Sequence, residues 1–232
     1  MILAGTSGYN YPEWRGRFYP ERLAGTKMLP YYAERFRTVE INATFYRMPT
    51  PALLAGWADQ VPEGFRFSLK APRRITHDRR LHECADLVAA FASAAATLGS
   101  RLGVLLFQLP PNLRCDLDRF DAFLDVLPAR VPAAFEFRHP SWWDEPVFDR
   151  LRRRNLALAI ADSDERRTPF VATADYGYLR LRDQDYGEAE LAAWARRVNE
   201  EPAWRDVFVY FKHEDEGRGP ELAARFTALL SR

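Results

Sequence analysis

The sequence is poor in cysteine, has no excess of either charge and contains no long apolar run. Its two cysteines, Cys84 and Cys115, are too few for a disulfide framework and are not spaced as zinc ligands. No apolar stretch approaches the ~20 residues that cross a membrane. The segment Met1–Thr6 lacks the basic residues and long apolar core of a secretory signal. We therefore expect a soluble, cytoplasmic protein with no membrane partner.

The charge balance also argues against some functions. Lysine and arginine number 33 against 32 aspartates and glutamates, a formal net charge of +1. Nucleic-acid-binding proteins usually carry a basic surplus, so a nucleic acid is not an expected partner. With 47% hydrophobic and 28% charged residues, the 232-residue chain can fill a large core and still cover it with polar surface. Its length is near the low end for an α/β barrel.

Short apolar runs recur along the chain, each followed by polar residues and usually by a segment with helical periodicity. Several runs are almost continuous Val, Leu, Ile and Phe, which is typical of parallel strands covered on both faces. Eight runs are candidate strands: Ile2–Thr6, Thr38–Asn42, Phe65–Lys70, Gly103–Leu109, Ala133–Arg138, Leu156–Asp162, Gly177–Arg182 and Val207–Phe211.

Apolar residues at steps of three and four predict helices between these strands, most clearly from Leu81 to Leu98. Asp116 and Ser141 are candidate caps of helices that end before residue 128 and near residue 154. Further stripes cover residues 191–198 and 220–230. The segment Ser163–Asp175 has no helical pattern, so we expect an irregular sixth crossover.

Eight alternating strand and helix units predict one α/β domain over residues 1–232, a (β/α)₈ barrel of the TIM type. The alternative is an open, doubly wound sheet, which would have two edge strands to protect.

Polar side chains gather at the carboxyl ends of the expected strands. Since side chains alternate along a strand, Glu40 shares a face with Asn42, and Glu136 shares one with Arg138. Barrel enzymes place their chemistry at this end. We therefore predict an enzyme, of hydrolase or of lyase or isomerase type, that binds a small polar or anionic ligand. The predicted catalytic residues are Glu40, Glu136, Lys70 and Asp162, with the two glutamates as an acid/base pair. The predicted ligand-binding residues are Asn42, Tyr46, His77, Gln108, Arg138, His139, Arg180, Arg182 and His213.

Other interpretations of the same residues stay open. Glu40 with Arg180, or Glu136 with Arg138, could be interior ion pairs that only stabilise the barrel. A non-catalytic ligand-binding protein would use the same pocket. A metal-dependent hydrolase or nucleic-acid-processing enzyme would need the acids and histidines to bind a divalent ion.

We favour an anion over a metal, and we predict no cofactor. The sequence has no HExxH motif or tight histidine pair. The cations expected at this end are slightly in excess over Glu40, Glu136 and Asp162, and they would repel a metal ion. They are Lys70, Arg138, Arg180, Arg182 and Lys212. The segment Gly5–Gly8 is one residue short of a nucleophile elbow, so Ser7 is a poor candidate nucleophile.

The chain resembles a known family at these same positions. Six motifs occur in order: Gly5-Thr6-Ser7-Gly8-Tyr9, Val39-Glu40-Ile41-Asn42-Ala43-Thr44-Phe45-Tyr46-Arg47, Phe67-Ser68-Leu69-Lys70, Ile75-Thr76-His77, Leu106-Phe107-Gln108-Leu109-Pro110-Pro111 and Glu136-Phe137-Arg138-His139-Pro140-Ser141-Trp142. The combination resembles the YecE-like family, the domain of unknown function numbered 72, from residue 3 to about residue 226. The resemblance implies a TIM-type barrel and no particular reaction.

Two segments depart from the pattern of many family members. Where those members read Tyr-x-Arg-x-His-Gly, this chain reads Tyr178-Leu179-Arg180-Leu181-Arg182-Asp183. Where they read Tyr-Phe-Asn-Asn, it reads Tyr210-Phe211-Lys212-His213. Both departures fall on the expected rim of the pocket.

Overall fold

Eight parallel strands form the centre of the protein in the computed structural model, which describes residues 1–162, 167–183, 186–213 and 217–230. All eight strands lie within two residues of their predicted bounds. They are β1 (Ile2–Ser7), β2 (Thr38–Ile41), β3 (Arg66–Lys70), β4 (Leu102–Gln108), β5 (Ala133–Glu136), β6 (Ala157–Ala161), β7 (Tyr176–Leu181) and β8 (Asp206–Phe211).

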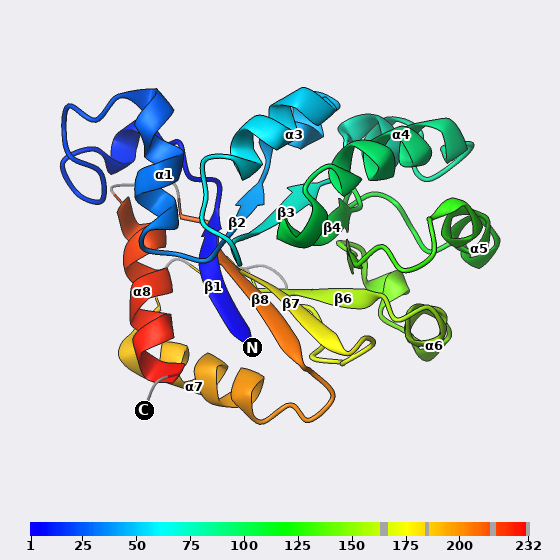
Figure 1. The fold of residues 1–232 in the computed structure, drawn as a ribbon. Coiled ribbons are helices and arrows are strands. Elements are labelled where there is room, and N and C mark those ends of the chain that lie inside the picture. The colour runs from blue at the N-terminus through cyan, green and yellow to red at the C-terminus, as the bar shows by residue number, and fades with distance from the viewer. Residues whose placement is uncertain (163–166, 184–185, 214–216, 231–232) are drawn as a thin grey trace.

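The strands pair in sequence order, and β8 closes the sheet against β1 in the register Ile2 to Val207. The closed barrel leaves no edge strand, and the helices surround it on the outside (Figure 1). The predicted TIM-type barrel is therefore confirmed, and the open sheet is wrong.

The helices follow the strands in the predicted alternation, and the segment between β2 and β3 contains two. The α-helices are α1 (Met28–Ala33), α2 (Ala43–Tyr46), α3 (Pro51–Ala58), α4 (Ala85–Ala96), α5 (Leu117–Val126), α6 (Glu145–Arg153), α7 (Glu188–Asn199) and α8 (Arg218–Leu230). Single turns of other helix types are η1 (Pro12–Trp14), η2 (Gly25–Lys27), η3 (Arg74–Asp78), η4 (Gly99–Arg101) and η5 (Pro140–Trp142). No helix among the residues described is long and apolar enough to cross a membrane.

The helix caps agree with the sequence in one case and differ in another. Asp116 caps α5 as predicted, since its side chain accepts a hydrogen bond of 3.0 Å from the backbone N–H of Arg119. The prediction that Ser141 caps α6 is wrong. Ser141 lies in η5, where its hydroxyl accepts a hydrogen bond from the Cys115 backbone, and Asp144 caps α6 instead.

The sixth crossover lacks a helix in its described part, residues 167–175, as the sequence predicted. Residues 163–166 of that prediction lie outside the described residues.

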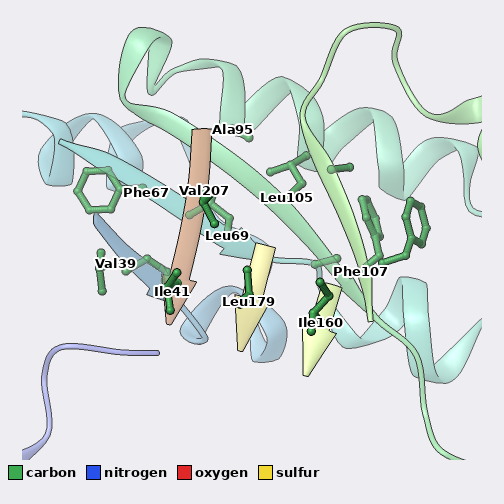
Figure 2. Packing of buried hydrophobic residues seen from close by; sticks show 14 of the residues in the cluster. Val39, Ile41, Phe67, Leu69, Ala95, Leu105, Phe107, Ile160, Leu179 and Val207 are labelled. Atoms are coloured by element: carbon green, nitrogen blue, oxygen red, sulfur yellow. The ribbon is translucent and has the colours of Figure 1, made fainter. Parts of the chain in front are cut away.

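Two apolar cores lie on opposite faces of the barrel wall. The outward residues of the strands, such as Val39, Phe67, Leu105 and Leu179, pack against the surrounding helices (Figure 2). The inward residues form a second cluster that fills the barrel: Leu3, Val104, Leu106, Ala134, Ala157, Ala159, Ala174, Tyr176, Tyr178, Phe208 and Tyr210.

Large and small side chains complement one another inside the barrel. Ala159 on β6 is paired in register with Tyr178 on β7, so a short side chain leaves room for a ring. The hydroxyl of Tyr210 lies 2.7 Å from Thr38 Oγ1 and 2.8 Å from Ser68 Oγ. A buried hydroxyl needs such partners, so the barrel interior becomes polar above its apolar base.

Gly5 allows the close approach of β1 and β2. A Cβ atom added at Gly5 would lie 2.2 Å from the carbonyl oxygen of Thr38. At Gly56, in the middle of α3, an added Cβ atom would meet nothing within 4 Å. A methyl group should therefore be unfavourable at Gly5 and tolerated at Gly56.

We expect Gly5→Ala to destabilise the protein by about 3 kcal/mol or more, because the strands must separate to admit the methyl group. Gly56→Ala is expected to stabilise it by roughly 0.5–1 kcal/mol, since alanine is the better helix former. Urea unfolding at pH 7 measures both changes. A Gly5→Ala variant as stable as the parent would contradict the packing described here.

Candidate active site

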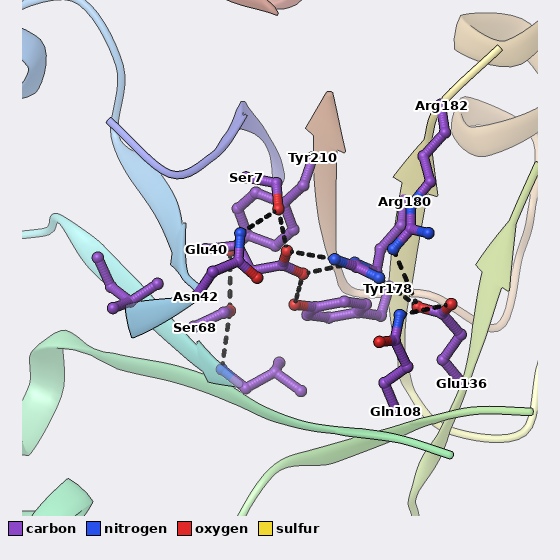
Figure 3. A network of polar contacts seen from close by, with 12 residues as sticks. Ser7, Glu40, Asn42, Ser68, Gln108, Glu136, Tyr178, Arg180, Arg182 and Tyr210 are labelled. Carbon is purple, nitrogen blue, oxygen red and sulfur yellow. Dashed lines mark hydrogen bonds and ion pairs between the residues drawn. The ribbon is translucent and has the colours of Figure 1, made fainter. Parts of the chain in front are cut away.

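The barrel mouth is the carboxyl-end opening of the barrel. Its residues lie on the inward face. On β1, β4, β5 and β7 they follow members of the inward cluster at steps of two, and on β2 and β3 they share the parity of Thr38 and Ser68, whose hydroxyls contact Tyr210. The residues at this opening are Ser7, Glu40, Asn42, Lys70, Gln108, Glu136, Arg180 and Arg182. Seven of them appear together in Figure 3, which does not label Lys70.

Arg180 joins three strands at the base of the barrel mouth. Its Nε and Nη2 atoms each donate a hydrogen bond of 2.8 Å to one oxygen of Glu40, and its Nη1 atom donates to Glu136 (Figure 3). The exposed fractions are 1% for Arg180, 0% for Glu40 and 2% for Glu136. Charges this deeply buried are tolerated only when they are paired, and here one guanidinium pairs with two carboxylates.

Both oxygens of Glu40 have further partners. Tyr178 donates its hydroxyl to Glu40 over 2.6 Å, and Ser7 donates its hydroxyl to the other oxygen. Ser7 Oγ in turn accepts a hydrogen bond of 2.8 Å from Asn42. Glu40 is therefore bound by four donors from three side chains, and Ser7 serves as one of them.

Glu136 is less enclosed than Glu40. Its Oε1 atom accepts a hydrogen bond of 2.8 Å from Gln108, and Arg182 Nη2 lies 3.7 Å from its Oε2 atom. The Arg182 side chain is 18% exposed, and its buried Nε atom has no hydrogen-bond partner within the described chain. The guanidinium of Arg182 is therefore only partly satisfied by the described chain.

The two carboxylates are held in the ionised form. Burial alone would raise the pKa of Glu40, but the charge and hydrogen bonds of Arg180 hold that pKa below its usual value. The pKa of Glu136 is lowered in the same way, against burial, by Arg180, Gln108 and Lys70. Neither group is therefore a proton donor near neutral pH.

Lys70 ends β3 on the inward face, and its Nζ atom lies 4.1 Å from the centre of the Phe45 ring. Within the described part of the chain its ammonium group makes neither a hydrogen bond nor an ion pair. Burial, followed by the positive charge of Arg180, lowers the pKa of Lys70 to about 8 although Glu40 and Glu136 act in the opposite direction. Lys70 therefore loses its proton more readily than an ordinary lysine.

His77, on the rim of the mouth, lies near the same positive charges. It lies in η3, with its ring 5.0 Å from that of Phe45. Burial lowers its pKa first, and the positive charges of Lys70, Arg73 and Arg138 lower it further. His77 is therefore neutral near pH 7, beside a cluster of cations.

Four predicted site residues lie away from this cluster. Asp162 follows β6 on the outward face, because Ala161 occupies the inward position. Its carboxylate accepts hydrogen bonds from the Arg182 backbone N–H, over 2.8 Å, and from the Tyr186 hydroxyl, over 2.5 Å. Burial raises its pKa. The prediction that Asp162 shares a site with the two glutamates does not agree with this placement.

The other three residues have contacts of their own. His139 Nδ1 accepts a hydrogen bond of 3.1 Å from the Ser141 backbone and caps η5. His213 Nε2 donates to the carbonyl oxygen of Asp183 over 2.7 Å. Tyr46 is 81% exposed on α2. Among the described residues, no group of three or more His, Cys, Asp or Glu side chains is placed to hold a metal ion.

The sequence did not identify Tyr178 and Phe45 as site residues, and it indicated only that Ser7 is a poor candidate nucleophile. Tyr178 has the same strand parity as Arg180, which is a signal for an inward side chain. Ser7 ends β1 on the inward face. Phe45 gave no such signal, since its position above Lys70 depends on how α2 folds back over β3.

Comparisons with known proteins agree with the fold. The family model described as "Protein of unknown function DUF72" matches residues 3–232. The protein YecE of Escherichia coli K12 is 34% identical over 169 residues, which cover 70% of this chain and 60% of YecE. The protein YunF of Bacillus subtilis 168 is 23% identical over an alignment of 271 residues, which covers 99% of this chain and 95% of YunF. The chain thus spans about 60% of the length of YecE.

Two crystal structures share the architecture. A DUF72 family protein of Thermotoga maritima superposes with a TM-score of 0.85 at 24% identity, over all of both chains. A DUF72 family protein of Enterococcus faecalis gives a TM-score of 0.81 at 21% identity, over 100% of this chain and 96% of the other. At these identities the likeness shows the fold alone.

We expect Arg180→Met to destabilise the protein by about 3–5 kcal/mol, because it leaves two buried carboxylates without a counter-charge. Adding Glu40→Gln and Glu136→Gln should restore part of that loss, since both buried charges are then removed. Urea unfolding at pH 7 measures each variant. The control is Arg205→Met, whose side chain is 85% exposed and which should change stability by less than ~0.5 kcal/mol. Equal effects at positions 180 and 205 would contradict the role of Arg180.

The loss of stability at acid pH should depend on Glu136. The folded pKa of Glu136 lies below its unfolded value. Its contribution is therefore complete above the unfolded pKa of about 4.3 and is lost as the pH falls from there through the folded pKa. We expect Glu136→Gln to flatten the loss of unfolding free energy between pH 5 and pH 3 in urea titrations. Glu63→Gln, at an exposed position, should leave that slope unchanged, and an unaltered slope in Glu136→Gln would refute this account.

Proposed function

Since the chain belongs to the DUF72 family, we propose a function from the chemistry of its own barrel mouth: an enzyme that acts on a small anionic molecule. This proposal rests on one observation: the acidic groups of the mouth are paired, and one of its basic groups, within the described chain, is not. Glu40 and Glu136 are occupied by Arg180, whereas Lys70 makes no ion pair among the described residues. The mouth therefore offers positive charge to whatever enters it.

The geometry supports an anion as the ligand. Arg182 presents a planar fork of donors above Glu136, and a fork of this shape matches two oxygens of a carboxylate or phosphate. Lys70 adds a point charge and lies within electrostatic range of Lys212. Binding an anion beside these groups would offset the cost of holding them close together.

The geometry also favours one reaction type over another. Glycoside hydrolysis by a carboxylate pair requires one protonated carboxyl group as the general acid. Glu40 and Glu136 both have lowered pKa values, and Glu40 is enclosed by four donors. We therefore assign the glutamates to positioning Arg180 and to balancing positive charge, in place of the acid/base roles that the sequence suggested. Lyase or isomerase chemistry, in which a neutral Lys70 accepts a proton or reacts with the substrate, fits the site better.

Anion binding is testable by thermal shift. At a hundredfold excess over Kd, a ligand of the native state stabilises it by about 2.7 kcal/mol, which raises the Tm of a domain this size by roughly 5–10 °C. We expect this shift with inorganic phosphate, sulfate or a small carboxylate at matched ionic strength, and not with magnesium, manganese or zinc.

Variants separate the barrel mouth from the rest of the surface. Lys70→Met and Arg182→Met should each weaken anion binding roughly ten- to hundredfold, because each removes a charged hydrogen-bond donor. Lys27→Met, at an exposed position in η2, is the matched control and should leave the shift unchanged. A shift seen only with a metal ion, or an anion shift that survives both mouth variants, would overturn the proposal.

A further inference from the structure

Lysine is rare in this chain, and its placement is informative. Of the 33 basic residues, 30 are arginine, and the three lysines are Lys27, Lys70 and Lys212. Lys70 and Lys212 interact electrostatically at the barrel mouth, whereas Lys27 is exposed elsewhere. Arginine supplies a permanent positive charge, but only lysine can release its proton and become a nucleophile. A lysine inside the mouth of so arginine-rich a protein therefore indicates chemistry as well as charge.

The surroundings of Lys70 suit a reactive amine. The charged groups that act on it come from four sides of the mouth: Arg180 from β7, Glu40 from β2, Glu136 from β5, and Lys212 after β8. The Phe45 ring covers it from α2, and the neutral His77 makes an edge contact with that ring, with the two ring centres 5.0 Å apart. Nothing within the described chain accepts a hydrogen bond from Lys70, so no hydrogen bond must be broken before the amine can react.

We propose that Lys70 is a nucleophile that forms an imine with the carbonyl carbon of a small aldehyde or ketone bearing a carboxylate or phosphate group. This inference rests on the proposed function and names its substrate class. The anionic group would be held by Arg182 and the positive field of the mouth, while the carbonyl carbon meets Lys70 Nζ.

The protonation state of Lys70 supports the step. With a pKa of about 8, Lys70 at pH 7.5 carries roughly two hundredfold more of the neutral amine than a lysine with the ordinary pKa of about 10.4. Its lone pair adds to the carbonyl carbon, the carbonyl π electrons move to oxygen, and one amine proton transfers to that oxygen. A second proton, from solvent, lets the oxygen leave as water, and the nitrogen keeps one proton as an iminium ion.

The iminium ion is suited to the charges beneath it. It carries a positive charge while it keeps its proton, and the ionised Glu40 and Glu136 lie at the base of the mouth. It withdraws electrons from the adjacent carbon, so that a neighbouring C–H or C–C bond breaks more readily. No electrons are gained or lost overall, and no cofactor is required. This agrees with the lyase or isomerase chemistry favoured above.

Borohydride trapping tests the imine directly. The native protein is incubated with pyruvate, glyoxylate or dihydroxyacetone phosphate, reduced with sodium borohydride, and mapped by peptide mass spectrometry. We expect one adduct per chain on Lys70, formed at least tenfold faster than any adduct on Lys27. The initial rate should rise with pH to half its maximum near pH 8, the pKa of Lys70. Lys27→Arg should retain the adduct, and Lys70→Arg should lose it.

The controls distinguish the two proposals. Lys70→Arg keeps the charge, so its thermal shift with inorganic phosphate should persist while its adduct disappears. A phosphate shift without any adduct would refute the imine and leave the anionic site standing. The absence of both would refute both. Equal labelling of Lys27 and Lys70 would show ordinary amine reactivity and refute the imine. Equal trapping with acetone, which has no anionic group, would refute the anionic substrate class.

Discussion

One buried guanidinium organises the carboxyl end of this barrel. Arg180 lies between Glu40 and Glu136, and all three side chains are almost completely removed from solvent. None of these charges is tolerable alone, so the position of each depends on the other two. Since they come from β7, β2 and β5, the triad links opposite parts of the barrel wall. It also keeps both carboxylates ionised, and it leaves Lys70 without a direct ion pair among the described residues.

The polar groups at the base of the barrel mouth have hydrogen-bond partners, whereas two groups above the base lack them among the described residues. Below, Ser7, Tyr178 and Gln108 complete the hydrogen bonds of the two carboxylates. Above, Lys70 and the Nε atom of Arg182 have no hydrogen-bond partner within the described chain. A base that is fully paired holds its geometry, whereas groups without partners gain most from a ligand. The contrast between the two levels is therefore the physical basis for the proposed site.

The fold that this chain shares with its relatives does not identify a reaction, because barrels of this type carry many chemistries at the same end. The rim is more specific. Arg182 and Lys212 stand where many proteins of the YecE-like pattern are expected to have histidine and asparagine. These two positions add positive charge to the mouth, so the preference for an anion proposed here belongs to this chain and is not extended to every relative.

The sequence by itself determined the barrel and the direction in which most of its polar residues point. Strand parity placed Glu40, Lys70, Glu136 and Arg180 on one face, because the two-residue repeat of a strand is a local property. Asp162 directly follows Ala161, the last residue of β6, so the same repeat places the Asp162 side chain on the opposite, outward face. Only the tertiary structure decided which charges meet. The contacts of Arg180 with Glu40 and Glu136 span 140 and 44 residues. Pairing over such distances depends on barrel closure and on burial, which no local pattern records, and so does the environment that lowers the pKa of Lys70 to about 8.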